Sequence, residues 1–299
     1  MIELLSITQD YVKNHVIPRY QNSKKGDNGI VLVIGGSSLY HGAPLLASLS
    51  ALRAGADLVY TAVPRIIVNP IRSYSPNIIA LPMTDNSLTI GSANRLIKSL
   101  PKIPHTASIG MGMTISKVEA LNSLVKNLRE KGTKLVLDAS ALVPKVISEI
   151  AETDTIITPH AGEFKRIFNQ NVGVSEKDIL STVSRMAIKH KITIVLKGWL
   201  NVIADESGKV ATIRRSTPAM TVGGTGDVLA GLVAALYSRM NSPFDASALA
   251  VYFNGVAATI AAEQIGFHMV ATDLIENLPK AIKPFDKLAR QKSRSSLIL

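Results

Sequence analysis

The sequence predicts an α/β fold, a three-layer α/β/α sandwich around a mostly parallel central sheet, on three observations. Short apolar runs rich in Val and Ile alternate with segments of helical length. The runs are almost continuously apolar, as is typical of strands that helices cover on both faces. No linker, repeat or change of composition divides the 299 residues. We therefore expect a single domain over residues 1–299, with an N-terminal extension over 1–24 and a flexible basic tail over 284–299.

Seven apolar runs are predicted to be buried strands, because Val and Ile favour the pleated backbone. A further pair of runs, 201–204 and 210–213, predicts an antiparallel hairpin at one side of the sheet, since the polar loop between them contains Gly208. The seven predicted strands are 30–34, 58–63, 77–81, 107–109, 134–137, 155–157 and 192–196.

Helices are predicted between these strands. Gly55 and Gly132 follow two of them as stop signals, and Ser175 precedes another as an N-cap, with Asp178 three residues on. The apolar stretch 246–265 is interrupted by polar residues and predicts a buried helix instead of a membrane span. The other predicted helices are 43–54, 116–131, 142–151, 175–190 and 227–239.

Composition narrows the classes of function. The chain has no Cys, which excludes disulfides, thiolate catalysis and Cys-based zinc sites and suits a cytoplasmic protein. Its net charge of +11 suits a nucleic acid, an anionic metabolite or no specific partner. The charges are scattered outside the tail and are not interleaved with aromatic residues, so we expect no nucleic-acid partner. The N-terminus has no cationic leader, and we expect no membrane partner.

The most specific motif is Gly-Gly-Thr-Gly-Asp at 223–227, which an apolar helical run follows at once. Glycines let the backbone approach a ligand closely, and the start of a helix offers free N–H groups to an anion. Asp227 could cap the helix, or it could take a proton from a hydroxyl group that attacks phosphorus. Three glycines exceed what a cap requires, which favours the second interpretation.

Five further motifs with glycine or charged residues follow predicted strands. Each alone has an ordinary explanation, such as a tight turn, a structural histidine, a glutamate that favours a helix dipole or a solvated lysine. The first lacks the GxGxxG spacing of a dinucleotide-binding turn. Because the carboxyl ends of parallel strands share one edge, their recurrence predicts a ligand site there. The motifs lie at 35–37 with 41–44, 108–112, 137–138, 158–163 and 196–198.

These motifs resemble those of the ADP-dependent NAD(P)H-hydrate dehydratases, a carbohydrate-kinase-like group within the ribokinase superfamily. The turn at 223–227 marks the superfamily, whereas Gly-Ala-Pro at 42–44 and Pro-His-Ala-Gly-Glu at 159–163 are typical of this group. The resemblance extends from about residue 25 to about residue 282.

The resemblance implies a ribokinase-like fold and a repair reaction. NADH or NADPH that has added water (NAD(P)HX) carries a hydroxyl group on its nicotinamide ring. The family phosphorylates the S epimer from ADP, or from ATP in eukaryotic relatives; phosphate then leaves, and NAD(P)H and AMP remain. Mg²⁺ is the implied cofactor, bridging the nucleotide phosphates, and no protein ligand for it is identified. A homotetramer is also implied.

By position, the resemblance assigns three groups of residues. The hydrated cofactor would contact Ala43, Gly112, His160 and Asp227, with Asp227 as the catalytic base. The adenine nucleotide would lie on Lys197, Gly198, Trp199, Leu200, Asn201 and Gly226. The amides of Gly224, Thr225 and Gly226 would form an anion hole for the transferred phosphoryl group.

Three positions depart from the family pattern. Met111 stands where Pro is common, Ser140 where a second acid is common, and Trp199 where a small residue is common beside the nucleotide. Many bacterial relatives also carry an N-terminal epimerase domain, but only about 25 residues precede the match here. We therefore expect a separate NAD(P)HX epimerase to act in the same pathway.

Three alternatives remain. A kinase of the same superfamily, acting on a hydroxymethylpyrimidine, a thiazole or a sugar, would share the turn at 223–227 and yield a stable phosphorylated product. A non-catalytic nucleotide-binding protein would not need Asp227. A dehydrogenase that transfers hydride is disfavoured, because its GxGxxG motif is absent.

Overall fold

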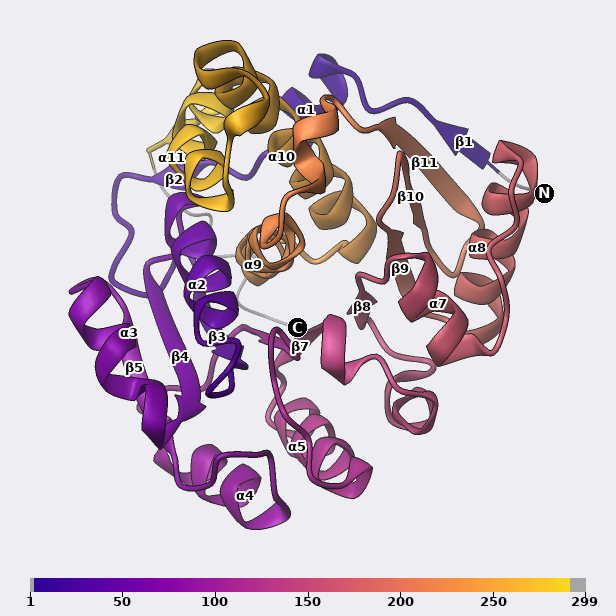
Figure 1. Ribbon diagram of the computed structural model, residues 1–299. Coiled ribbons are helices and arrows are strands. Elements are labelled where there is room, and N and C mark those ends of the chain that lie inside the picture. The colour runs from indigo at the N-terminus through magenta and orange to yellow at the C-terminus, as the bar shows by residue number, and fades with distance from the viewer. Residues whose placement is uncertain (1–2, 291–299) are drawn as a thin grey trace.

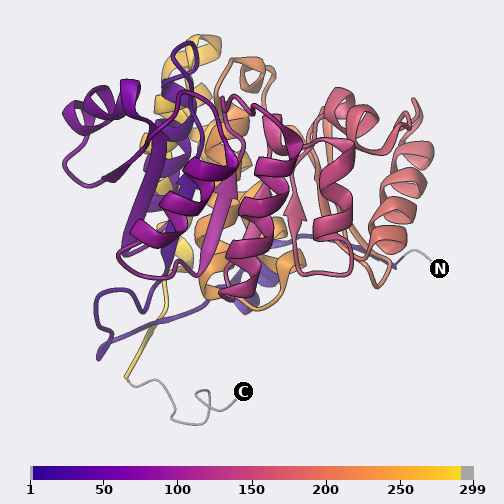
Figure 2. The same ribbon diagram turned by 90° about the horizontal axis from the view of Figure 1, so that it is seen from below.

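The computed structural model describes residues 3–290, which form a ten-stranded sheet covered by helices on both faces (Figures 1 and 2). The strand order is β1-β11-β10-β9-β8-β7-β6-β3-β4-β5. All neighbouring pairs are parallel except β9–β10 and β10–β11. The predicted fold class, a mostly parallel α/β/α sandwich, is confirmed.

All seven predicted buried strands and the hairpin are present, although β5 lies two residues later than expected. The hairpin is at one side of the sheet, and β1 adds a parallel strand outside it. The strands are β1 (Glu3–Leu5), β2 (Arg19–Tyr20), β3 (Ile30–Ile34), β4 (Leu58–Pro64), β5 (Ile79–Met83), β6 (Thr106–Ile109), β7 (Lys134–Leu137), β8 (Ile156–Ile157), β9 (Thr193–Leu196), β10 (Leu200–Ala204), β11 (Lys209–Arg214) and β12 (Leu288–Ala289).

The predicted helices are present except for 142–151, where a 3₁₀ turn at Pro144–Val146 leads into a helix of only four residues. Pro144 disfavours helical backbone at Val143, so the helix begins late. The helices are α1 (Gln9–His15), α2 (Gly42–Arg53), α3 (Val68–Tyr74), α4 (Ile90–Ser99), α5 (Val118–Glu130), α6 (Ile147–Ile150), α7 (Ala161–Phe168), α8 (Glu176–His190), α9 (Thr225–Arg239), α10 (Pro243–Ile265) and α11 (Ala271–Ile282).

Both faces of the sheet are buried, which explains the unbroken apolar runs. On β3, Val31 and Val33 pack into the layer of α2, α9, α10 and α11. The alternate residues Leu32 and Ile34 pack into the layer of α4, α5, α7 and α8 on the other face. When helices cover both faces of a strand, an apolar residue at every position stabilises the fold.

Among residues 3–290, the segment Pro243–His268, which contains α10, is the one helix long and apolar enough to cross a membrane. Of its most apolar 18-residue window, 67% is buried inside the protein. The helix packs against α9 and α11. Most of its apolar residues therefore belong to the core. The predicted buried helix over 246–265 is confirmed, except that Thr259 and residues 263–265 are exposed.

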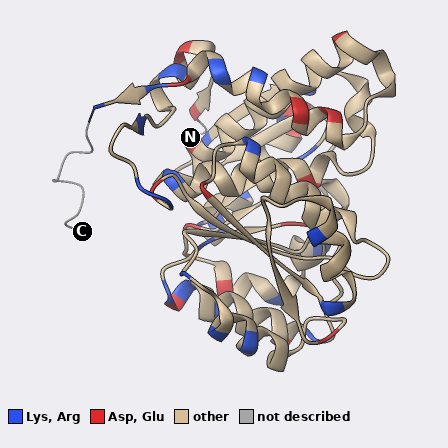
Figure 3. Cartoon of the chain, turned by 90° about the vertical axis from the view of Figure 1, so that its left-hand side faces the viewer, with Lys and Arg blue, Asp and Glu red and all other residues tan. Residues whose placement is uncertain are grey.

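The terminal segments pack on the domain. Tyr11 of α1 donates a hydrogen bond to Asp245 of α10, and β2 pairs with β12. The first part of the tail that was expected to be flexible therefore forms a 3₁₀ turn at Lys283–Phe285 and a short strand, since Phe285 is buried. The remainder of that tail, 291–299, lies outside the described residues. Lys and Arg are spread over both helical layers (Figure 3).

Candidate active site at the carboxyl edge of the sheet

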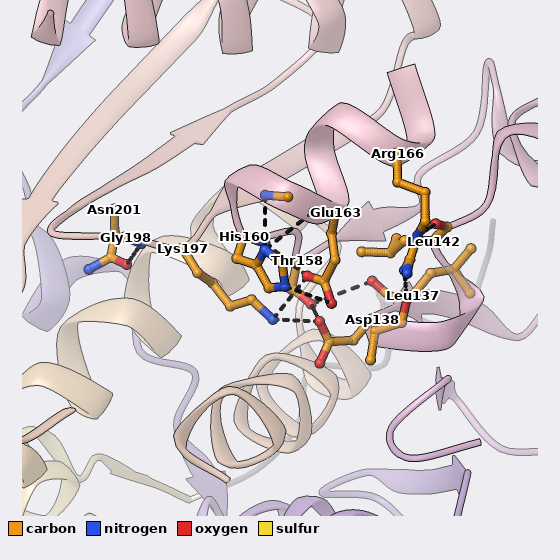
Figure 4. A network of polar contacts seen from close by, with 12 residues as sticks. Leu137, Asp138, Leu142, Thr158, His160, Glu163, Arg166, Lys197, Gly198 and Asn201 are labelled. Atoms are coloured by element: carbon orange, nitrogen blue, oxygen red, sulfur yellow. Dashed lines mark hydrogen bonds and ion pairs between the residues drawn. The ribbon is translucent and has the colours of Figure 1, made fainter. Parts of the chain in front are cut away.

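The predicted strand-end motifs meet at one edge of the sheet. Asp138 follows β7, His160 follows β8 and Lys197 follows β9, and these three strands are parallel neighbours. A bridge between His160 and Lys197 extends the pairing of β8 and β9, with Lys197 N donating to Pro159 O at 2.8 Å. Figure 4 shows the side chains of these residues turned toward one another.

Lys197 is the centre of this polar cluster. Its Nζ lies 2.6 Å from Asp138 Oδ1 and 3.8 Å from Glu163 Oε2. Asp138 Oδ1 also accepts a hydrogen bond from Thr158 Oγ1 at 2.9 Å. Burial works to lower the pKa of Lys197, but the Asp138 and Glu163 carboxylates outweigh it and the pKa is raised. Lys197 therefore presents a fixed, protonated ammonium group to the site.

His160 combines a capping role with an exposed ring nitrogen. Its Nδ1 accepts hydrogen bonds from the amides of Gly162 and Glu163 at 3.0 and 3.2 Å. Glu163 Oε2 in turn accepts the His160 amide at 2.8 Å, which completes a reciprocal cap at the start of α7. In a neutral ring this arrangement leaves the proton on Nε2. Nε2 lies 3.5 Å from Glu163 Oε1, and the side chain is 59% exposed, so the ring edge can also reach a ligand.

The glycine turn before α9 is a candidate anion site. Gly224 is the N-cap, with φ of 94°, and a Cβ there would lie 2.6 Å from Leu46 Cδ1. Within residues 3–290, the amides of Gly224, Thr225 and Gly226 donate no backbone hydrogen bond. Thr225 Oγ1 donates to Met220 O at 3.0 Å and so ties down the turn. Three free amides at the positive end of a helix suit a phosphate group.

Asp227 lies in the first turn of α9 and does not cap it. In the described part of the chain its carboxylate takes part in no hydrogen bond or ion pair, and the N-cap is Gly224. Burial first, and then the negative charge of Asp138, raise the pKa of Asp227 to about 7; Glu163 adds to this effect and Lys197 opposes it. A carboxylate with a pKa near neutrality is suited to accept a proton.

A cavity of about 200 Å³ adjoins the glycine turn. Lys197, Gly198, Asn201 and Gly226 line it, and a Cβ on Gly226 would lie 3.4 Å from Lys197 Nζ. The cavity therefore joins four of the predicted nucleotide residues to the anion site.

Two predicted nucleotide residues do not line this cavity. Leu200 is buried in β10, so only its backbone can face a nucleotide. The Trp199 ring is half exposed and lies 5.2 Å from Arg214 Cζ, a cation–π contact. Trp199 stands where the family commonly has a small residue beside the nucleotide, and here its ring packs on Arg214 of the hairpin.

Sequence reasoning missed Asn254 of α10 as a lining residue of the cavity. It is 4% exposed, and its Oδ1 has no hydrogen-bond partner within residues 3–290. A buried amide without partners costs free energy unless a ligand pairs with it. The available signal was a lone Asn inside an apolar helix, which we interpreted only as evidence against a membrane span.

The predicted substrate residues Ala43 and Gly112 are neighbours in space. A Cβ on Gly112, whose φ is 62°, would lie 3.1 Å from Ala43 Cβ and 2.7 Å from Tyr40 Cβ. Met111, where the family often has Pro, is fully buried and fills the core below this turn. Ser140 donates its amide to Gly110 O at 3.3 Å. These contacts fix the β6 loop against the start of α2.

Comparisons with known proteins identify the family of this chain. A family model described as NAD(P)H-hydrate dehydratase matches residues 31–280. The ADP-dependent (S)-NAD(P)H-hydrate dehydratase of Nitrosopumilus maritimus is 45% identical over 283 residues, which cover 95% of this chain and 98% of that protein.

Solved structures agree as well. The ADP/ATP-dependent NAD(P)H-hydrate dehydratase of Bacillus subtilis, co-crystallised with ATP and Mg²⁺, has a TM-score of 0.80 at 26% identity and covers 93% of this chain and 98% of its own. A ribokinase-like superfamily protein of Enterococcus faecalis, at 22% identity with a TM-score of 0.81, covers 95% of this chain and 97% of its own and supports the fold alone. The chain belongs to the NAD(P)H-hydrate dehydratase family.

Proposed function

We propose that this protein is an ADP-dependent (S)-NAD(P)H-hydrate dehydratase, which restores NADH and NADPH from their hydrates and releases AMP and phosphate. The observation that carries the proposal is Asp227. Its carboxylate has a pKa of about 7 and stands in the same helical turn as the free amides of the anion site. The name of the Nitrosopumilus relative describes the same reaction.

The geometry suits phosphoryl transfer to a ring hydroxyl group. The terminal phosphoryl group of ADP would lie on the amides of Gly224, Thr225 and Gly226, with Lys197 Nζ beside it. Asp227 would take the hydroxyl proton while the hydroxyl oxygen bonds to phosphorus and the bond to AMP breaks. Phosphate then leaves the ring carbon, and loss of a neighbouring ring proton restores the double bond.

The hydrated nicotinamide would lie between the start of α2 and the start of α7. Ala43 and Gly112 offer a surface without large side chains, which allows a flat ring to approach the backbone. His160 Nε2 faces the same edge of the sheet and can donate a hydrogen bond to the substrate. Together they would hold the hydroxyl group near Asp227.

The residues of this site suit a Mg²⁺ ion that binds together with the nucleotide. Within residues 3–290, no group of three or more His, Cys, Asp or Glu side chains could hold a metal ion alone. Mg²⁺ usually binds one or two carboxylates together with phosphate oxygens and water. Asp138, at the same edge of the sheet, would be the carboxylate available for this role, whereas Asp227 is left to accept the hydroxyl proton. When bound, the ion would neutralise charge on the phosphates.

We also propose the cellular setting. A cytoplasmic location suits a chain without Cys. A separate epimerase would act in the same pathway, because an enzyme specific for the S epimer leaves the other epimer unrepaired. The homotetramer is proposed from the resemblance alone.

The test is incubation of the purified protein with NADH hydrate, Mg²⁺ and either ADP or ATP. Absorbance reports restored NADH, and released phosphate is counted in parallel. NADH formed one-for-one with phosphate supports the dehydratase and identifies its nucleotide, with Asp227→Asn as the inactive control. No NADH from either epimer with either nucleotide would refute it, and a stable phosphorylated product would indicate a kinase.

A further inference from the structure

A second cavity, of about 540 Å³, lies at the opposite edge of the sheet from the active site. It is enclosed by the C-terminal ends of α2, α9 and α11 and by the segment before β2; we call it the basal cavity. Helix α9 begins at the glycine turn and ends at this cavity. At about 1.5 Å per residue, the helix separates the two sites by roughly 20 Å. The basal cavity is therefore distinct from the nucleotide site.

The inner wall of the basal cavity is apolar. Val16, Leu236, Leu249, Phe253 and Ile282 contribute to it. Its volume is within the range of small-molecule sites, which are about 300–1,000 Å³ and mostly apolar. A ligand that fits this wall must carry a hydrocarbon part.

The mouth of the basal cavity is cationic. Five Lys or Arg residues and one acid, Asp286, are among the lining residues. Three of these cations, Arg53, Lys283 and Lys287, are exposed and form no ion pair or side-chain hydrogen bond with any described residue. Three unpaired cations around one opening attract an anionic group.

Arg239 adds a second, independent sign of uncompensated charge. Its guanidinium group is partly buried in the wall and donates to the carbonyl oxygens of Ile17 and Pro18 at 3.0 and 3.1 Å. Burial, and then the neighbouring Arg19, lower the pKa of Arg239, although Asp57 and Asp286 oppose the effect. Lys287 and Arg290 also flank β12 in the sequence. A bound anion would offset this repulsion.

We propose that the basal cavity binds an amphipathic anion, an unbranched aliphatic carboxylate held as a free molecule. The hydrocarbon chain would lie against Leu236, Leu249 and Phe253, and the carboxylate would lie among Arg53, Lys283 and Lys287. The two halves of the cavity, apolar wall and cationic mouth, match the two halves of such a molecule.

The test is titration calorimetry of the whole protein with sodium hexanoate, octanoate and decanoate. Each added methylene group should tighten binding about fourfold, as burial of one CH₂ predicts. The charge reversals Lys283→Glu and Lys287→Glu together should weaken decanoate binding about tenfold or more. The matched pair Lys98→Glu and Lys102→Glu, on an exposed surface elsewhere, should leave it unchanged. Saturating ADP should also leave it unchanged.

Several results would overturn the proposal. These are no binding of decanoate up to about 1 mM, no dependence on chain length, or competition by ADP. Equal weakening by both pairs of reversals would indicate a general charge effect. If the pair at Lys283 and Lys287 instead changes the oligomeric state in sedimentation, the basal cavity is an interface between copies of the chain. None of these results bears on the dehydratase activity, which is measured separately.

Discussion

Neighbouring carboxylates help to raise the pKa of Asp227, and replacing Asp138 with Asn tests this effect. Asp227 must be ionised to accept a proton, so kcat/KM for NADH hydrate should rise with pH through about 7. At pH 6 only about one-tenth of a group with this pKa is ionised, and the rate should be about tenfold below its plateau. An ordinary Asp would show no such loss.

Asp138→Asn removes the negative charge that, after burial, contributes most to this raised pKa. The acid limb of the profile should then move down by about one pH unit, so that about half of the plateau rate is present at pH 6. Glu163→Gln should move the limb in the same direction by less, because its charge contributes less. Lys197→Met should move it upward, since that cation opposes the rise.

The assay is restored NADH absorbance between about pH 5 and about pH 9, with ADP saturating in every variant. The charge on the nucleotide shifts the acid limb of the pH profile by the same amount in every variant, so the test compares the limbs of the variants with one another. Glu130→Gln, which neutralises an exposed carboxylate on α5, is the matched control and should leave the limb in place. A limb below pH 5 in the wild type, or one that none of the three variants moves, would refute the reasoning.

Three further outcomes follow from the same site. Asp227→Asn should stabilise the protein by up to about 4 kcal/mol at pH 8 and by less at pH 5, as measured by urea unfolding. The reason is that folding raises the pKa of the Asp227 carboxyl from 3.8 to about 7, so the wild-type protein loses stability as the pH rises through that interval. Gly224→Ala should lower stability by about 2 kcal/mol in thermal unfolding and reduce kcat/KM, since φ is 94° and Leu46 occupies the space; an unchanged melting temperature would contradict this. Asn254→Leu should raise the KM for ADP without loss of stability, because it removes a buried, unpaired Oδ1.

The sheet could be predicted because its signal is local. Strands covered on both faces leave continuous runs of Val and Ile, and seven such runs became strands. Strands without such a run were not predicted. These are β1, β2 and β12, which have only two or three residues each, too few to show a pattern. The predicted helix at 142–151 failed because Pro144 overrides an otherwise helical composition.

The place of the candidate site was predictable, but the contacts within it were not. Glycines and charged residues after strands indicate the edge at which a parallel sheet binds ligands. The contact between Asp138 and Lys197, however, joins residues 59 positions apart, and their spacing along the chain contains no sign of it. Asn254 was missed for the same reason, because its helix reaches the cavity only through tertiary packing.

The pKa of Asp227 is a property of the packing of α9, which no motif contains. On α9, a Cβ at Gly231 would collide with the backbone of Ala47 on α2, so glycine there permits the two helices to lie in contact. That contact holds the first turn of α9 over the edge of the sheet, beside Asp138 and Lys197. Burial there is the largest cause of the raised pKa, so close helix packing gives Asp227 the pKa that the proposed base requires near neutral pH.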